Sequence, residues 1–432
     1  MSSEWPVQRL DQIAEINPAR KVRKGSVVPF VDMAALPQHS RDIGAEGVLV
    51  REAKGAGAHF QNGDTLLARI TPCLENGKTA QVRCLDGDAI AEGSTEFIVL
   101  CGKDPEDNDF IYYLCREPAF REYAIGRMEG TSGRQRVSWQ SIAAYEFAFP
   151  PPDERRAAAC VLSALDDRIT LLRETNATLE AIAQALFKSW FVDFDPVHAK
   201  ARGEQPEALP EPLAALFPDS FEESPLGLVP RGWRVGVFAD ICARIESGGT
   251  PKRTVPEYWN GNVSWLTSGE VRNPIVFETR ETISDLGMKE SSAKLWPQGT
   301  TVVAMYGATA GEVCLVAKPM TANQACCGLI PNPHTRAFMY VCARRERESL
   351  ASKSSGSAQQ NLNKGLVESH PTVLPPDDLL RAYEDIAGVM LDGWIANAQQ
   401  AHTLSTLRDT LLPRLISGQL RLPEAEAEAL AA

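Results

Sequence analysis

The sequence predicts an α+β fold: two mixed α/β domains separated by two long antiparallel coiled-coil helices, with an internal pseudo-two-fold repeat. Three observations predict it. One segment occurs twice along the chain, both copies carry a heptad pattern of apolar residues, and each copy follows a stretch of strand-like runs and turns.

The duplicated segment begins with consecutive prolines. Its first copy runs from Pro150 to about Phe191, and its second runs from Pro375 to about Ile416. A shift of 225 positions aligns the two copies without a gap. Identical pairs include Ser132 and Ser357, Gln135 and Gln360, Pro150 and Pro375, Pro151 and Pro376, Asp153 and Asp378, Asp167 and Asp392, Thr178 and Thr403, Leu179 and Leu404, and Leu186 and Leu411. Duplication at one fixed spacing indicates a pseudo-symmetric molecule with a helical middle.

Each copy is expected to form one long helix. Proline disfavours helix in the residue before it, and Asp153 or Asp378 can accept the free N–H groups of the first turn. Gly418 is well placed to end the second helix. The apolar seam comprises Ala158, Leu165, Leu172, Leu179 and Leu186 in the first copy and Ile386, Met390, Leu404, Leu407 and Leu411 in the second. Each seam needs a partner, which we expect the other copy to supply, and about forty residues of helix make a rod of roughly 60 Å.

The repeat divides the chain into domains and connections. We predict a first mixed domain at residues 1–149, a first spacer helix at 150–195, a linker at 196–230, a second mixed domain at 231–374, a second spacer helix at 375–422 and an acidic, alanine-rich tail at 423–432.

Both mixed domains combine strands with a helix. In the first domain, strands are predicted at 27–31, 65–70, 79–82, 97–100 and 145–149, with a helix at 110–125. In the second domain, strands are predicted at 263–267 and 299–306 and a helix at 336–349, and residues 299–306 correspond to residues 63–70. In the proline-rich linker, only a short helix at 213–217 is expected.

Composition favours a multidomain globular protein. A chain of 432 residues suggests two to four domains. No run approaches membrane-spanning length and the first residues are polar, so we expect a cytoplasmic protein. The ten cysteines include no C-x-x-C pair, which indicates reduced core cysteines and no zinc site. The net charge of −12 argues against a chain that coats DNA non-specifically.

The acidic charge is unevenly distributed. Residues 193–230 carry −6 and residues 375–432 carry −5, whereas residues 231–374 carry +4. A nucleic-acid surface on this chain must therefore be a local patch.

The sequence lacks the motifs of the common enzyme classes. The stretch from Glu75 to Thr79 ends like a phosphate-binding loop, but Pro72 occupies the position of the required first glycine. No G-x-G-x-x-G follows a strand, no H-E-x-x-H or G-x-S-x-G occurs, and the Asn-Pro-Pro-aromatic box of adenine methyltransferases is missing. We therefore expect a chain without its own catalytic site or metal.

Polar loops in the two domains offer side chains that read base edges. Arg bonds guanine in a bidentate manner, and Gln or Asn bonds adenine in the same way. The loops with these residues are Arg134-Gln135-Arg136, Lys252-Arg253 and Gln359-Gln360-Asn361. Paired loops on duplicated domains favour DNA recognition over a merely solvated surface.

Four stretches resemble the specificity subunit of type I restriction-modification systems, and the resemblance covers nearly the whole chain. They are the runs from Ala185 to Pro196, from Leu226 to Trp233, from Gly248 to Pro251 and from Leu411 to Gly418. The family often has Glu-Gln directly after its double proline, whereas this chain has Glu154-Arg155 and Asp378-Leu379.

The resemblance implies a function in DNA recognition. Two target recognition domains would each read half of a bipartite, asymmetric DNA site, and the paired helices would space them and dock two methylation subunits. Those partners would hold S-adenosylmethionine and flip out the target adenine for N6 methylation, and motor-nuclease subunits would use ATP and Mg²⁺. The chain itself would hold no cofactor and would not be an enzyme. Half-site centres about one helical turn apart would suit such a molecule.

Two sets of residues are candidates for these contacts. The candidate DNA-binding residues are Arg69, Thr71, Lys78, Arg134, Gln135, Arg136, Ser247, Lys252, Arg253, Thr267, Tyr306, Gln359, Gln360 and Asn361. The candidate partner-binding residues are Leu165, Leu172, Leu179, Leu186, Trp190, Leu404, Leu411 and Leu415.

Other classes of function stay open. A DNA-binding adaptor of a different defence system could use the same fold without these partners, and genomic neighbours would discriminate between the two. A structural coiled-coil scaffold would explain the helices but not the duplicated domains with polar loops. A self-contained nuclease would need a metal-binding carboxylate cluster, which the spacing of acidic residues does not suggest.

Overall fold

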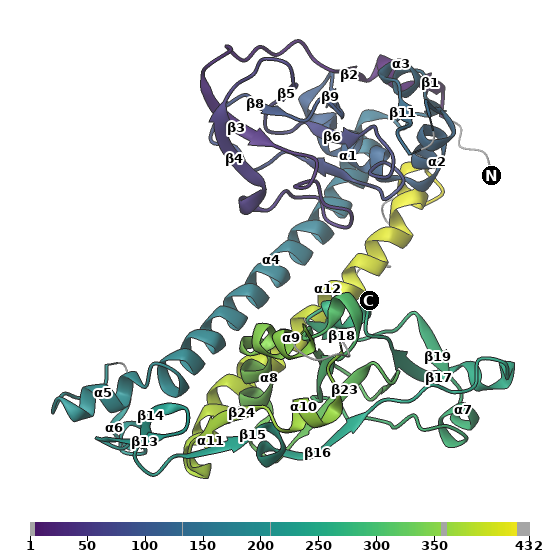
Figure 1. The fold of residues 1–432 in the computed structure, drawn as a ribbon. Coiled ribbons are helices and arrows are strands. Elements are labelled where there is room, and N and C mark those ends of the chain that lie inside the picture. The colour runs from purple at the N-terminus through teal and green to yellow at the C-terminus, as the bar shows by residue number, and fades with distance from the viewer. Residues whose placement is uncertain (1–4, 132, 208, 356–360, 421–432) are drawn as a thin grey trace. The chain divides into compact units, whose positions relative to one another are not determined.

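The computed structural model describes residues 5–131, 133–207, 209–355 and 361–420 (Figure 1). The chain forms two compact units. The first contains the residues up to Leu172 and those from Gln400 onward, and the second contains residues 173–399. Both boundaries fall inside long helices, α4 (Pro152–Phe191) and α12 (Val389–Ile416). Each unit therefore combines one globular domain with a segment of each long helix, a division that sequence order alone did not predict.

The first globular domain, β1 to β12, contains two four-stranded sheets. The antiparallel sheet has the order β2-β9-β6-β7, and the mixed sheet has the order β4-β3-β8-β5, with β3 and β8 parallel. The strands of the antiparallel sheet are β2 (Ala14–Ile16), β9 (Phe97–Gly102), β6 (Thr65–Ala68) and β7 (Thr79–Gln81). Those of the mixed sheet are β4 (Val48–Glu52), β3 (Val27–Val31), β8 (Ala91–Gly93) and β5 (Ala58–Phe60).

Short elements complete this domain. Two small antiparallel ladders pair β1 (Val7–Arg9) with β12 (Glu146–Ala148) and β10 (Met128–Glu129) with β11 (Arg136–Val137). The helices are α1 (Asn108–Arg116), α2 (Pro118–Gly126) and α3 (Trp139–Ala143).

The second globular domain, β15 to β24, repeats this plan. Its larger sheet has the order β16-β23-β20-β21-β18 and its smaller sheet the order β19-β17-β22, with β17 and β22 parallel. The strands are β16 (Cys242–Ser247), β23 (Cys326–Pro331), β20 (Thr301–Ala304), β21 (Val313–Val316), β18 (Ile275–Val276), β19 (Glu281–Ile283), β17 (Trp259–Leu266), β22 (Thr321–Ala322), β15 (Arg234–Val237) and β24 (Pro371–Leu374). The helices are α7 (Asp285–Lys289), α8 (Arg336–Arg345), α9 (Arg347–Ser355) and α10 (Lys364–Glu368).

The predicted internal repeat is confirmed element by element. β2-β9-β6-β7 corresponds to β16-β23-β20-β21, and the β1-β12 ladder corresponds to the β15-β24 ladder. The caps correspond as well. Ser138 Oγ accepts the N–H of Ser141 at 3.0 Å at the start of α3, and 225 positions later Asn363 Oδ1 accepts the N–H of Leu366 at 3.0 Å at the start of α10.

The two long helices pack against each other in an antiparallel manner within the first unit. Arg408 Nη1 donates to Asp166 Oδ1 at 2.6 Å, and Arg168 Nη2 donates to Gln400 Oε1 at 3.5 Å, so residue numbers rise on α4 as they fall on α12. Apolar residues of both helices join the same buried clusters. The seam that the heptad pattern predicted is therefore buried by the other copy.

The same pairing occurs within the second unit. Asn176 Nδ2 donates to the Trp394 carbonyl at 3.1 Å, and Tyr383 Oη donates to the Ala183 carbonyl at 3.0 Å. Tyr383 ends α11 (Asp377–Tyr383), and a π-helical turn over Glu384–Gly388 joins α11 to α12. α12 ends two residues before Gly418, whose φ is 71°, as predicted for a glycine at a helix C-terminus.

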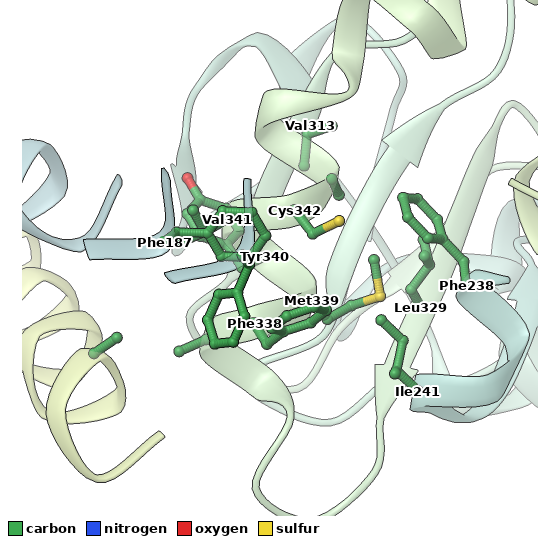
Figure 2. Close-up of a cluster of buried hydrophobic side chains, with 14 of the residues drawn as sticks. Phe187, Phe238, Ile241, Val313, Leu329, Phe338, Met339, Tyr340, Val341 and Cys342 are labelled. Carbon is green, nitrogen blue, oxygen red and sulfur yellow. The ribbon is translucent and has the colours of Figure 1, made fainter. Parts of the chain in front are cut away.

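The core of the second domain is built around α8. Figure 2 shows the consecutive residues Phe338–Cys342 directed into an apolar cluster with Phe187 of α4 and Leu329 of β23. Their side chains are nearly inaccessible because the sheet covers one side of α8 and the long helices cover another. Burial raises the pKa of the Cys342 thiol to about 12, so this cysteine is an inert core residue, as expected for this chain.

Three local predictions need correction. The helix expected at 110–125 is interrupted at Glu117, because Pro118 begins α2. Asp378 does not cap its helix, since α11 starts at Asp377 after Pro376 and has no side-chain cap. The linker is more ordered than predicted. Its elements are α5 (Asp195–Ala201), α6 (Glu211–Ala214) and the hairpin of β13 (Phe221–Ser224) and β14 (Gly227–Pro230).

The buried ion pair between Asp166 and Arg408 gives the first testable prediction. Both side chains are at most 7% exposed, and Asp166 also accepts a hydrogen bond from Tyr113 Oη at 2.8 Å. Asp166→Ala leaves the buried Arg408 guanidinium with Asp409, which is 62% exposed, as its carboxylate partner, and this is expected to lower the free energy of unfolding by about 3–5 kcal/mol. Thermal or urea unfolding measures the loss. Glu204→Ala, which breaks the exposed pair with Arg202, is the matched control and should leave unfolding unchanged.

Candidate nucleic-acid interface

In the first domain, backbone hydrogen bonds bring three predicted segments side by side. The N–H of Arg69 donates to the Glu96 carbonyl at 3.0 Å, and the N–H of Val137 donates to the Arg69 carbonyl at 3.0 Å. The N–H of Thr71 donates to the Gln135 carbonyl at 3.0 Å. The segment 69–71 therefore lies between Glu96 and the segment 135–137, which gathers Arg69, Thr71, Gln135 and Arg136 just beyond the end of β6.

Arg136 is the most strongly oriented side chain of this group. Its Nε lies 3.0 and 2.9 Å from the two carboxylate oxygens of Glu96, and its Nη2 lies 2.7 Å from Glu96 Oε1. Its Nη1 donates to the Arg134 carbonyl at 3.2 Å. The Arg136 side chain remains 41% exposed, so it is accessible at the surface.

The remaining first-domain candidates differ in their accessibility. The Arg134 side chain is exposed. Lys78, in contrast, donates through Nζ to the Met33 carbonyl at 2.7 Å and is only partly exposed. The structure thus uses Lys78 to hold the segment around Met33, and DNA binding by this residue stays a prediction.

In the second domain, equivalent segments meet just beyond the end of β20. The N–H of Met305 donates to the Ala325 carbonyl at 2.7 Å, and the N–H of Leu362 donates to the Met305 carbonyl at 3.0 Å. Asn361 thus occupies the place of Arg136, beside Tyr306, whose side chain is 39% exposed. Gln359 and Gln360 lie outside the described residues.

A second loop of this domain, residues 248–258, is anchored by glycine contacts and indole hydrogen bonds. The N–H of Gly248 donates to the Cys326 carbonyl at 3.0 Å. Trp265 Nε1 donates to the Gly249 carbonyl at 2.9 Å, and Trp259 Nε1 donates to the Lys252 carbonyl at 3.2 Å. These bonds fix the backbone that carries the exposed side chains of Lys252 and Arg253.

Arg253 is held by a carboxylate and by aromatic rings. Its Nη2 lies 2.9 Å from Glu281 Oε2, and its Nη1 also bonds this carboxylate. The guanidinium carbon lies 3.9 Å from the centroid of the Trp259 ring and 4.9 Å from that of the Trp265 ring. The hydrogen bond from Arg253 lowers the pKa of Glu281, and the same bond raises the pKa of Arg253, so both groups stay charged near neutral pH.

Ser247 and Thr267 are less exposed than Lys252 and Arg253. Ser247 ends β16 opposite Cys327 of β23. Thr267 Oγ1 donates to Glu270 Oε2 at 2.7 Å, so its hydroxyl is used within its own turn. Both residues are partly exposed, and their contact with DNA stays a prediction.

Several residues of this region were missed by the sequence analysis. Glu96 and Glu281 were not predicted, because a single acidic residue just before a strand or at its start has no signal of its own. The basic run Arg20–Lys24 follows β2 as the loop 248–258 follows β16, so it is the first-domain counterpart of Lys252 and Arg253. Its exposed side chains are Lys21, Arg23 and Lys24. This run is visible in the sequence, and its equivalence became clear only from the sheet order.

The candidate partner-binding residues pack within the chain. Those that are at most 9% exposed are Leu165, Leu172, Trp190, Leu411 and Leu415. Those that are partly buried against the same cores are Leu179, Leu186 and Leu404. These side chains stabilise the chain's own helices, and their contact with another subunit stays a prediction.

The described part of the chain offers no metal site and no membrane helix. Among these residues, no group of three His, Cys, Asp or Glu side chains could hold a metal ion. None of the helices described is both long enough and apolar enough to cross a membrane.

A groove of about 540 Å³ lies between α4 and α8 within the second unit. Four basic residues line it, namely Lys188, Arg344, Arg345 and Arg347. Arg344 is paired with Glu180 at 3.1 Å. The groove is therefore a positively charged surface between helices and does not resemble an enclosed catalytic pocket.

Comparison with known proteins decides the family. A family model described as "Type I restriction modification DNA specificity domain" matches residues 230–379, which span the second domain. The specificity subunit of the type I restriction enzyme HindI from Haemophilus influenzae is 28% identical over 410 residues, covering 84% of this chain and 87% of that protein. The MjaIX specificity subunit from Methanocaldococcus jannaschii is 23% identical over 441 residues, covering 98% of this chain and 94% of that protein.

Nearly the whole chain is similar to the specificity subunits of type I restriction-modification systems, and its second domain matches their DNA specificity domain. The crystal structure of the S subunit of such a system from M. genitalium has the same fold, with a TM-score of 0.57 at 16% identity over 96% of both chains. The relatives are specificity subunits, the non-catalytic DNA-recognition components of their complexes, and this supports the expectation that the chain is not an enzyme. The polar loops described above are therefore the candidate recognition surfaces of this specificity subunit.

Gly248 provides a test of the loop that carries Arg253. A Cβ atom at this position would lie 2.2 Å from the Asn323 carbonyl oxygen and 2.4 Å from that of Ala322. Gly248→Ala must displace the loop backbone, which is expected to cost about 1–3 kcal/mol of stability and to weaken DNA recognition by the second domain. Thermal unfolding and DNA-binding titrations of the assembled complex measure both effects. Gly269→Ala is the matched control because its Cβ meets nothing within 4 Å, and equal behaviour of the two variants would contradict the prediction.

Proposed function

We propose that this specificity subunit reads a bipartite, asymmetric DNA site, one half with each globular domain. The observation that carries the proposal is a pair of equivalent sites with different side chains. Arg136 lies beside the segment that follows β6 in the first domain, and Asn361 lies beside the segment that follows β20 in the second. Equivalent positions with different chemistry suit two readers of different sequences, because the base contacted depends on the side chain that reaches the groove.

The side chains at these two equivalent sites, around Arg136 and around Asn361, favour different bases. An arginine presents parallel N–H donors to O6 and N7 of guanine, whereas an asparagine amide matches N6 and N7 of adenine. Arg134 and Arg136 therefore favour guanine within the first half-site, and Asn361 favours adenine within the second. The exposed side chains of Lys21, Arg23 and Lys24 are suited to phosphate contacts, which position a protein on DNA without reading its sequence.

The catalytic steps belong to partner subunits. Two methylation subunits would hold S-adenosylmethionine and methylate N6 of a flipped adenine, and motor-nuclease subunits would use ATP and Mg²⁺ to translocate and cut. The relatives support assembly because their names describe them as subunits of restriction enzymes. This complex would act in the cytoplasm, where chromosomal DNA is accessible.

The net charge of −12 sets the conditions for binding. An acidic chain that makes few phosphate contacts gains little from counterion release, so the isolated subunit should bind DNA weakly. The methylation subunits would then add most phosphate contacts. Binding measurements therefore need the assembled complex rather than the chain alone.

The genome-wide N6-methyladenine pattern tests the proposed function. A host expressing this chain with its neighbouring methylation subunit is expected to show one bipartite motif, and a host lacking only this chain should show none. Absence of a motif despite formation of the protein complex would contradict the proposal and would favour an adaptor of a different defence system.

Arginine substitutions test the assignment of the first domain. Arg134→Ala and Arg136→Ala are each expected to weaken recognition of one half-site on the order of tenfold, because a bidentate base contact contributes roughly 1–3 kcal/mol of discrimination. The other half-site should be read as before. Methylation kinetics on duplexes altered in one half-site measure the effect, with Arg202→Ala as a control on an exposed linker arginine. Unchanged methylation of all sites would remove these arginines from the set of readers.

A further inference from the structure

Two exposed arginines, one in each domain, are held by a glutamate in a fixed orientation. Glu96 engages the Nε and Nη2 edge of Arg136, with contacts between 2.7 and 3.0 Å. Glu281 engages the Nη1 and Nη2 edge of Arg253, and its Oε2 lies 2.9 Å from Nη2. Each carboxylate thus occupies one planar edge of a guanidinium group, which is the strong bidentate arrangement.

A second contact restrains each guanidinium. Arg136 Nη1 donates to the Arg134 carbonyl at 3.2 Å, and the Arg136 backbone belongs to the ladder with β10. Arg253 lies on Trp259 and near Trp265, whose rings meet edge to face with centroids 5.0 Å apart. Ordinary surface arginines keep most of their rotamer freedom, whereas these two have lost it before any ligand arrives.

The opposite edge of each guanidinium keeps hydrogen-bond donors. A guanidinium has five N–H groups. After the bonds formed with described residues, Arg136 keeps one hydrogen on Nη1 and one on Nη2, and Arg253 keeps the Nε hydrogen, one on Nη1 and one on Nη2. The Arg136 and Arg253 side chains are 41% and 53% exposed, so these donors can meet a ligand with two adjacent acceptors.

Another Arg–Glu pair of the first domain has a different character. Glu92 is 1% exposed and accepts the N–H of Gly55 at 2.8 Å as well as Arg51 Nη2 at 2.7 Å. That carboxylate ties the turn after β4 to the core, a structural role. Glu96 and Glu281, at 25% and 38% exposure, lie at the surface beside predicted reading loops and hold side chains instead of a turn.

We propose that Glu96 and Glu281 are positioning residues that orient Arg136 and Arg253 to read a guanine in the respective half-site. The inference rests on the proposed function. It adds which base each arginine contacts and which glutamate orients that arginine. O6 and N7 of guanine form the adjacent acceptor pair that the open guanidinium edge matches. Because the arginine is oriented before binding, less conformational entropy is lost when it contacts guanine. A base with a hydrogen-bond donor in place of O6 or N7 then binds less well, because the arginine cannot turn away from it.

Glutamate substitutions in the assembled methylation complex test this inference. Glu96→Ala is expected to reduce the preference for guanine over other bases at one position of one half-site by roughly tenfold, since the arginine then samples other orientations. Glu96→Gln, which retains the side-chain shape and one acceptor, should give an intermediate loss. Glu281→Ala should have the corresponding effect in the other half-site only. The readout is the rate of methylation on duplexes in which each position of the motif is varied in turn.

Controls separate positioning from a structural role. Glu204→Ala breaks an exposed Arg–Glu pair of the linker and should leave every preference unchanged. The double variant Glu96→Ala with Arg136→Ala should discriminate no less than Arg136→Ala alone, because the glutamate acts through the arginine. Thermal unfolding of each variant shows whether the fold is retained, and Glu96→Gln serves if Glu96→Ala is unstable.

Three outcomes would overturn the inference. In the first, the glutamate variants slow methylation of all duplexes equally and keep the motif intact, as expected for a structural ion pair. In the second, they bind all DNA more tightly without loss of preference, as expected if the carboxylate only repels phosphates. In the third, the wild-type complex methylates no bipartite motif, which overturns the proposed function as well. If the wild-type complex methylates a bipartite motif and the glutamate variants keep its base preferences, the positioning roles are rejected and the proposed function stands.

Discussion

The structure depends on burial of the apolar seams of two long helices. A helix of 40 residues with a heptad stripe, such as α4, cannot leave that stripe in water, and burial of a leucine stabilises by about 1.5–3 kcal/mol. The chain meets this need internally because it contains the segment twice. In both units the segment of α4 packs on the segment of α12 in an antiparallel manner, and buried polar contacts such as that between Asp166 and Arg408 fix which residues face each other.

Each globular domain is built onto such a helix pair, and its core is continuous with it. In the second unit, Phe187 of α4 and Tyr383 of α11 join the cluster around α8, and in the first unit Leu162 of α4 joins the cluster around α1. The candidate recognition loops follow strands whose register is set by the sheets. Packing therefore determines the scaffold, while the loop side chains are free to differ between the domains.

The candidate readers illustrate how electrostatics prepares a surface for a ligand. An unrestrained arginine loses side-chain conformational entropy when it binds a base. A carboxylate on one edge of the guanidinium and an aromatic ring or carbonyl beside it restrict the side chain before binding, so less entropy is lost on binding. In each domain a glutamate lies next to the arginine that it orients, Glu96 beside Arg136 and Glu281 beside Arg253. These acidic residues lower the overall affinity for DNA, which is consistent with a protein that recognises a specific sequence. The acidic total of the chain and its role in DNA recognition are thus compatible.

The sequence by itself determined the repeat, the long helices and most strands, because the periodicity of apolar residues and the positions of proline and glycine act locally. It also identified the loops around Arg136 and Arg253. Only the tertiary structure decided which residues meet: that Glu96 and Glu281 hold these arginines, that Lys78 donates to a main-chain carbonyl, and that Leu411 and Trp190 are buried inside the chain. Such pairings join residues up to hundreds of positions apart, so their partners depend on strand order and helix packing, which no local pattern specifies.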